Sequence, residues 1–240
     1  DFTAPDGIRH QLWQVGEAGP VRRIEALYSR IPCSYIADGH HRAAASSRVA
    51  AARREQGEGP DGPAQFFLTI QFPAGRMQVL EYNRLVRDLG GLDRDRLLAG
   101  IREAGFDLQS SPEGRKPPAR GTFGMILEGE WYLLKAGPGM SGGDDPVERL
   151  DVSILTRLLL NPVLGIGDPR TDPRLECVGG IRGAGYLEDQ VKAGRFAAGF
   201  VLYPTSLEEV MAVADAGGVM PPKSTWFEPK ARSGMVYRSI

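Results

Sequence analysis

The sequence predicts a mixed α/β fold, with helices and strands alternating along one globular chain. The chain has 240 residues, of which 42% are hydrophobic and 25% charged, which is enough for a sizeable core. Apolar residues recur at helical spacing in some segments and at strand spacing in others. No apolar run approaches the ~18 to 20 residues that a membrane span requires.

Composition narrows the classes of partner. A formal net charge of -1 predicts no broad electrostatic surface for nucleic acid. Two cysteines, Cys33 and Cys177, supply neither a disulfide framework nor a zinc site by themselves. Residues 1–3 lack the pattern of a signal peptide, so we expect a cytoplasmic protein with no membrane partner. Composition leaves the oligomeric state open.

The first fifty residues predict two strands and two helices. Apolar spacing favours a strand over 8–15, an amphipathic helix over 21–28 and a buried strand over 34–37. Residues 43–54 are so rich in alanine that they predict a helix. The tight turn between the last strand and this helix is the most informative local arrangement in the sequence.

The middle of the chain predicts two hairpins and a helix. Residues 65–72 and 76–82 have the composition of strands joined by a Pro-Ala-Gly turn. Residues 93–104 predict a helix that Asp93 caps and Gly105 ends. A second hairpin is predicted over 122–134, around the turn Glu128-Gly129-Glu130.

After a glycine-rich stretch, the chain alternates regularly between helix and strand. Helices are predicted over 152–160, 187–192 and 206–216, and strands over 176–178 and 196–203. Ser206 and Glu209 form a capping box for the last helix. We predict a first lobe over 1–135, a linker over 136–146 and a second lobe over 147–240.

The first candidate site is the turn Asp38-Gly39-His40-His41-Arg42, called the histidine turn below. It lies where a strand is predicted to meet a helix N-terminus, whose amides and dipole favour anions. Gly39 lets the backbone approach a phosphate, and His41 and Arg42 can donate charge-assisted hydrogen bonds. Asp38, His40 and His41 are candidate catalytic residues, and Asp38 can also hold Mg²⁺. The alternative is structural: Asp38 caps the helix, one histidine packs in the core and Arg42 is solvated.

The second candidate site is the segment 220–230, MPPKSTWFEPK, in which prolines prevent a helix or a central strand. Its preceding glycines imitate a phosphate-binding P-loop, but Pro222 replaces the second glycine, so we reject that assignment. We predict instead that side chains bind phosphate here, from Lys223, Ser224, Thr225 and Lys230. The alternative is that the segment only supports the fold.

Three stretches resemble a known family. Residues 35–45, residues 150–155 and above all 220–230 are similar to the bacterial and archaeal domain of unknown function number 1015 (DUF1015). The resemblance covers essentially the entire chain, and it implies a further N-terminal region with polar motifs of its own.

The histidine turn also resembles the nucleotide-binding box of the ParB and sulfiredoxin superfamily. There, a glycine-led turn ending in arginine opens a helix beneath nucleotide phosphates. His40 stands where sulfiredoxins carry cysteine, and no basic DNA-recognition helix like that of ParB proteins follows. The small-molecule kinases of the superfamily, which include free-serine kinases, match the turn best in residue type.

These resemblances imply a ParB/sulfiredoxin-like core with a C-terminal α/β lobe. They also imply a nucleotide-dependent phosphotransferase that acts on a small hydroxyl metabolite, with free serine as precedent. ATP, ADP or CTP and Mg²⁺ are the expected nucleotides and cofactor. One alternative is a regulatory or ParB-like protein that binds nucleotide without kinase activity, and another is a purely structural role for both segments.

Overall fold

The computed structural model describes residues 1–140, 142–230 and 232–238. It divides into two compact units, Asp1–Ile36 and Ala37–Ile240. The first unit holds a short antiparallel pair, β1 (Phe2–Thr3) with β2 (Arg9–His10), and one helix, α1 (Ala18–Tyr28). The predicted helix is confirmed, whereas the strand predicted over 8–15 shrinks to the two residues of β2.

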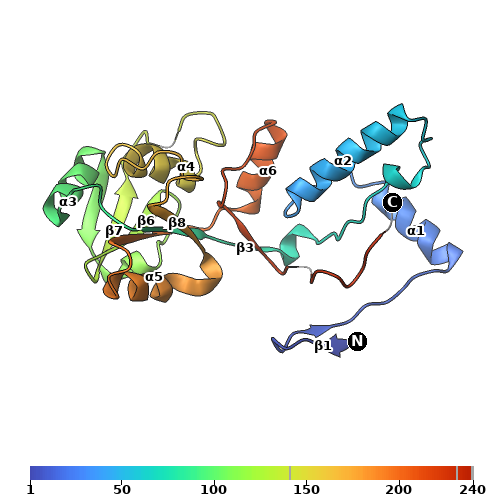
Figure 1. Cartoon of the computed structure of the whole chain (residues 1–240), viewed down its shortest axis with the longest axis horizontal. Helices are drawn as coiled ribbons and strands as arrows, with labels where there is room; N and C mark the ends of the chain where they lie inside the picture. Colours follow the sequence, from blue (N-terminus) through green and yellow to red (C-terminus); the bar gives the residue numbers. More distant parts are fainter. Residues whose placement is uncertain (141, 231, 239–240) are drawn as a thin grey trace. The chain divides into compact units, whose positions relative to one another are not determined.

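The second unit is built on a six-stranded sheet, which confirms the mixed α/β class (Figure 1). Every adjacent pair of strands is antiparallel, in the order β5-β7-β6-β9-β4-β8. The strands are β4 (Tyr82–Val86), β5 (Phe106–Ser110), β6 (Thr122–Leu127), β7 (Glu130–Ala136), β8 (Leu175–Gly179) and β9 (Ala198–Leu202). The hairpin β6–β7 is confirmed, and Glu128 and Gly129 both have positive φ, as a tight two-residue turn requires.

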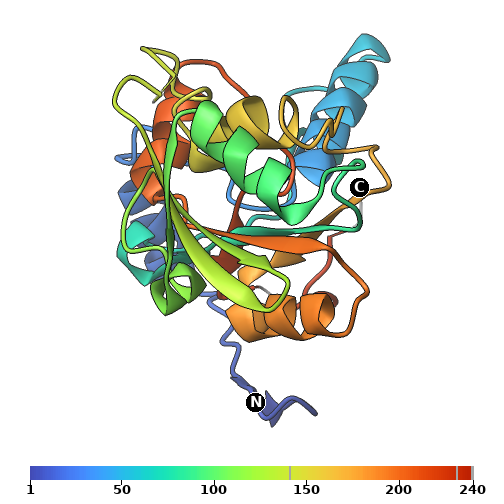
Figure 2. The ribbon, with the colours of Figure 1, turned by 90° about the vertical axis from the view of Figure 1, so that its left-hand side faces the viewer.

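Helices cover both faces of this sheet (Figure 2). On one face, Met125 and Phe200 pack with α3 (Arg94–Glu103) and α4 (Asp151–Leu155), which a π-helical segment, Thr156–Leu160, continues. On the other face, Ile126 and Val201 pack with α5 (Gly183–Lys192). Neighbouring residues of one strand therefore enter different cores, because side chains alternate across a sheet.

The sheet takes strands from both sides of 136–146. β4 to β7 precede this segment and β8 and β9 follow it, yet β6 and β4 both pair with β9. The division of the chain into lobes over 1–135 and 147–240, with a ParB-like core in the first, stays a prediction.

Two predicted strands are wrong. Residues 34–37 and residues 66–72 form no ladder with any described strand, and 34–36 and 66–72 are exposed. Their apolar composition fits a strand, but a strand persists only where a neighbour pairs with its backbone. The first predicted hairpin is also replaced: β3 (Gln78–Leu80) pairs with β10 (Trp226–Glu228), at the far end of the chain.

The helices α2 and α6 begin and end close to their predicted bounds. α2 (His40–Glu55) contains the alanine-rich stretch, and all of its residues are at least partly exposed. α6 (Leu207–Asp215) begins with the predicted capping box: Ser206 Oγ accepts from the Glu209 amide, and the Glu209 carboxylate accepts from the Ser206 amide.

Removing this cap is expected to destabilise the fold measurably. Ser206→Ala leaves the Glu209 amide without its acceptor, at a cost of about 1 kcal/mol in the free energy of unfolding. Urea denaturation checks this, with Ser206→Asp as the control that keeps an acceptor. A Ser206→Ala variant as stable as Ser206→Asp would show that α6 does not depend on the cap.

Candidate functional site

The histidine turn begins the long helix α2. Gly39 is the N-cap residue and has φ +83°, a left-handed conformation that favours glycine. Its amide donates to Asp38 Oδ1 at 2.8 Å, and its carbonyl accepts from Ala43 at 3.0 Å. A Cβ on Gly39 would lie 3.9 Å from Arg42 Nε, so the arginine side chain passes beside the glycine. The turn therefore brings a carboxylate, a guanidinium and a helix N-terminus together.

The C-terminal loop reaches this turn. Lys230 Nζ lies 3.4 Å from Asp38 Oδ2, an ion pair between residues 192 positions apart. The ammonium also lies 4.9 Å from the centre of the Trp226 ring, and Trp226 Nε1 donates to Glu228 Oε1 at 2.7 Å. Because β10 pairs with β3, the strand pairing holds Trp226 and positions Lys230 just beyond it.

The local charges keep Asp38 ionised. Partial burial raises the pKa of its carboxyl, but the Gly39 amide and then Lys230 and Arg42 outweigh that effect, and the net pKa lies below the ordinary value. The carboxylate remains largely exposed, with 69% of its side-chain surface accessible. It is therefore an accessible anion within a cationic surrounding.

Tyr82 and Lys223 extend the cluster towards the sheet. Lys223 Nζ lies 5.8 Å from the centre of the Tyr82 ring, and the Tyr82 and Trp226 rings are 5.8 Å apart. Burial raises the pKa of Tyr82, and the charges of Cys177 and Asp38 raise it further, whereas Arg84 lowers it. Asp38 is therefore within electrostatic reach of Tyr82, and Lys223 lies beside the same ring.

Arg84 anchors the C-terminal loop to the sheet. Its side chain is fully buried, and Nη2 donates to the Lys223 carbonyl at 3.0 Å. Burial lowers the pKa of Arg84, and its Nε has no hydrogen-bond partner among the described residues. Lys223 itself has φ +54°. Sequence patterns missed Arg84 and Tyr82, because the strand predicted over 76–82 ends at Tyr82 and does not include Arg84, whereas the structure has β4 over Tyr82–Val86.

The remaining predicted site residues make fewer contacts with one another. His40, His41 and Arg42 lie in the first turn of α2, and all three are exposed. Ser224 is buried and its hydroxyl donates to the Pro221 carbonyl at 2.7 Å, while Thr225 is half-buried. The structure therefore brings Asp38 and Lys230 into contact and directs the Ser224 hydroxyl to the backbone. The roles of these residues in binding phosphate stay predictions.

Neither a metal cluster nor a membrane helix occurs in the part of the chain that the structure describes. Across residues 1–140, 142–230 and 232–238, no group of three or more His, Cys, Asp or Glu side chains is arranged to hold a metal ion. Over the same residues, no helix combines the length and apolarity of a membrane span.

An antiparallel sheet covered by helices, with a cationic turn at a helix N-terminus, defines a mixed α/β protein with a candidate anion site. Residues 1–153 match the model of the family described as "Protein of unknown function (DUF1015)", and the chain belongs to this family.

Solved structures give a weaker likeness. A free serine kinase in complex with AMP is 15% identical, with a TM-score of 0.43, over 89% of this chain and 81% of that chain. A mutant of a free serine kinase in complex with ADP is 16% identical, with a TM-score of 0.45 over the same shares. A conserved hypothetical protein from Pyrococcus furiosus is 16% identical, with a TM-score of 0.44, over 86% of this chain and 81% of that chain. No curated protein matches the chain.

Proposed function

We propose that the histidine turn and Lys230 bind the phosphates of a nucleotide, and that the protein transfers the terminal phosphoryl group to a small hydroxyl metabolite. The observation that supports this most is the 3.4 Å ion pair between Asp38 and Lys230. It adds an exposed ammonium to a helix N-terminus that already carries Arg42 and two histidines. Positive charges at a helix N-terminus favour the binding of a polyanion such as a nucleotide triphosphate group. The same charges suit phosphoryl transfer, because catalysis of that reaction depends mainly on positioning and charge neutralisation.

Each residue of the turn has a defined task in this reaction. The hydroxyl oxygen attacks the terminal phosphorus, the bond from that phosphorus to its bridging oxygen breaks, and the nucleoside diphosphate leaves with the electron pair. The Asp38 carboxylate accepts the hydroxyl proton, and its ionised state suits that task. His40 orients the acceptor, and His41, Arg42 and the Gly39 amide hold the phosphates. Free serine is the acceptor precedent in the superfamily that the turn resembles.

Two lysines neutralise the negative charge of the phosphates. Lys230 moves from Asp38 to the transferred phosphoryl group, while Lys223, beside Tyr82, offers a second ammonium. Thr225 is available as a further hydroxyl donor, and the Ser224 hydroxyl would first have to leave the Pro221 carbonyl.

Asp38 can serve as the protein ligand of a Mg²⁺ ion at this site. Magnesium in nucleotide sites is held by one or two carboxylates together with substrate phosphates, so an exposed Asp38 beside the phosphates is a sufficient protein ligand. When bound, the ion neutralises phosphate charge.

A nucleotide is expected to stabilise the protein through Arg42. At 100 times its dissociation constant, a ligand that binds only the folded state adds about 2.7 kcal/mol. We expect this shift with ATP, ADP or CTP in the presence of Mg²⁺, and we expect Arg42→Ala to lose it. Thermal unfolding with these nucleotides, GTP and pyrophosphate measures the effect. Arg48→Ala, an exposed arginine of the same helix, is the control.

The outcome separates a binding role from a structural one. Equal shifts in Arg42→Ala and Arg48→Ala would remove the turn from nucleotide binding. A loss of stability in Arg42→Ala without any ligand would instead indicate a structural role for the turn.

A regulatory role is the second candidate, and the same ion pair favours it. If Lys230 turns from Asp38 to a bound phosphate, binding loosens the contact between the C-terminal loop and the histidine turn. Tight nucleotide binding with a changed oligomeric state, and no phosphorylated acceptor, would support such a switch.

A further inference from the structure

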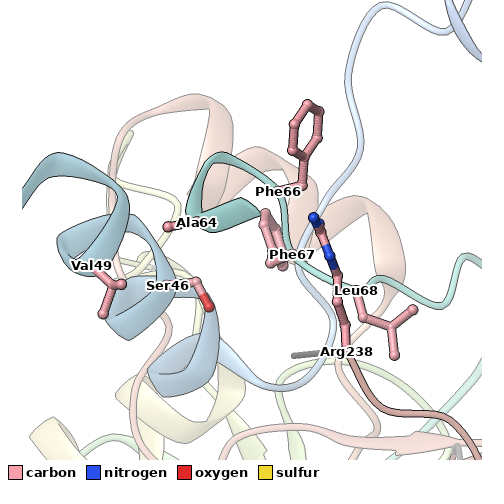
Figure 3. Close-up of a pocket in the computed structure, with 7 residues that line it drawn as sticks. All are labelled: Ser46, Val49, Ala64, Phe66, Phe67, Leu68 and Arg238. Carbon is pink, nitrogen blue, oxygen red and sulfur yellow. The ribbon is translucent and has the colours of Figure 1, made fainter. Parts of the chain in front are cut away.

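A pocket lined by aromatic rings lies further along α2. It has a volume of about 190 Å³ and is lined by Ser46, Val49, Ala64, Phe66, Phe67, Leu68 and Arg238. Figure 3 shows Ser46 and Val49 on the helix, and Phe66 to Leu68 on the following extended segment with Arg238 beside them. These seven residues are called the aromatic pocket below.

The rings of this pocket are open to solvent. Phe66 is 50% exposed and Phe67 54% exposed. The Arg238 guanidinium carbon lies 5.3 Å from the centre of the Phe66 ring, within range of a cation–π contact. Exposed phenylalanines with an arginine over one face are the elements on which a planar aromatic ligand stacks.

Two segments connect this pocket to the histidine turn. Ser46 and Val49 follow His40 by six and nine residues on the same helix, which corresponds to about 9 to 14 Å at 1.5 Å per residue. The C-terminal segment also connects the two sites, because Lys230 contacts Asp38 at the turn and Arg238 contacts Phe66 at the pocket. A ligand with an anionic end and an aromatic end would meet the right chemistry at each.

We propose that the aromatic pocket binds the base of the nucleotide whose phosphates bind at the histidine turn. This inference rests on the proposed function and adds the class of group that the second site takes, a planar heterocycle. The base stacks on the ring of Phe66, on the face that Arg238 does not cover. The Ser46 hydroxyl, which can donate or accept, reaches the polar edge of the base.

The pocket is too small for a whole nucleotide. Sites for complete drug-sized ligands have volumes of about 300 to 1,000 Å³, whereas this pocket has about 190 Å³. Its size therefore fits one ring system, with the sugar and phosphates lying outside it along α2.

The experiment compares three ligands with the full chain: ATP, pyrophosphate and adenosine, by isothermal titration calorimetry. ATP tests both sites, pyrophosphate tests only the turn, and adenosine tests only the pocket. Phe66→Ala is expected to weaken ATP and adenosine binding by about 5- to 150-fold, since stacking of a base on one aromatic ring contributes about 1 to 3 kcal/mol. Pyrophosphate affinity should not change.

The matched control is Ile70→Ala, in the same extended segment, 58% exposed and outside the pocket. It removes a similar apolar surface, so it should leave all three affinities unchanged. Because Phe66 is half-exposed, both variants are expected to fold, and their melting temperatures check this.

The outcomes distinguish this inference from the proposed function. If pyrophosphate binds and ATP binds no more tightly, the turn keeps its function and the base pocket is overturned. If neither pyrophosphate nor ATP binds, the proposed function fails and this inference with it. If Phe66→Ala changes the oligomeric state and leaves ATP affinity intact, the rings are a protein interface and the inference is overturned.

Discussion

Replacing Asp38 with asparagine is expected to abolish phosphoryl transfer and leave the fold intact. The amide cannot accept the proton of the hydroxyl acceptor, and the loss of such a base lowers turnover by about 10²- to 10⁴-fold. The oxygen of the new side-chain amide can still accept from the Gly39 backbone, and the position is largely exposed. We therefore expect stability to change by no more than about 0.5 kcal/mol. Release of nucleoside diphosphate with free serine as acceptor measures the turnover.

Asp93 provides a matched control for this substitution. It also lies at a helix N-terminus, accepts a backbone amide and is 66% exposed, but it caps α3. Asp93→Asn keeps a good cap and should retain full turnover. Equal activity of Asp38→Asn and Asp93→Asn would remove Asp38 from the mechanism.

Replacing Asp151 with asparagine is expected to change how stability depends on pH. Asp151 begins α4, is 7% exposed and accepts the Gly121 amide through Oδ1 at 2.9 Å. Its Oδ2 has no hydrogen-bond partner among the described residues. Burial raises its pKa from 3.8 to about 6, and the Glu209 carboxylate adds to the effect, while the Gly121 amide and Arg120 oppose it.

The direction of this change depends on which state binds the proton more tightly. Between about pH 4 and pH 6 the folded state holds this proton more tightly than the unfolded chain, so its contribution to stability is lost as pH rises through 6. A shift of two pKa units corresponds to about 3 kcal/mol. The difference in unfolding free energy, Asp151→Asn minus wild type, should rise by about that amount between pH 4 and pH 7.

Urea unfolding across this pH range measures the difference, and comparison with the wild type cancels the other carboxyl groups. Asp95→Asn, an exposed carboxyl in the first turn of α3, should differ from the wild type by less than about 0.5 kcal/mol throughout. A flat difference for Asp151→Asn would show that its carboxyl is ionised at no cost in the folded state.

The elements predicted correctly carry their signal locally. The alanine-rich run of α2, the Asp93 cap of α3 and the capping box of α6 depend on side chains within a few residues of the backbone that they stabilise. The β6–β7 hairpin depends on its Glu128-Gly129 turn. These contacts are short in sequence, so composition and spacing suffice to predict them.

Strand partners could not be predicted in the same way. Residues 65–72 and 76–82 look like a hairpin, yet β3 pairs with β10, which lies at the opposite end of the chain. Strand pairing depends on which backbone segments lie next to each other in the folded chain. A segment with the composition of a strand, such as 66–72, forms no ladder when no partner strand lies beside it.

The mixed α/β class, the family and the histidine turn at the start of a helix can be predicted from the sequence, because each depends on neighbouring residues. Three contacts instead depend on the folded arrangement: Lys230 contacts Asp38, buried Arg84 donates to the Lys223 carbonyl, and Arg238 lies over the Phe66 ring. These contacts join residues far apart in the chain, and they exist only once β10 has paired with β3 and β4 has entered the sheet. The spacing of residues along the sequence does not predict the distances between these side chains, because those distances depend on how the strands pair and pack.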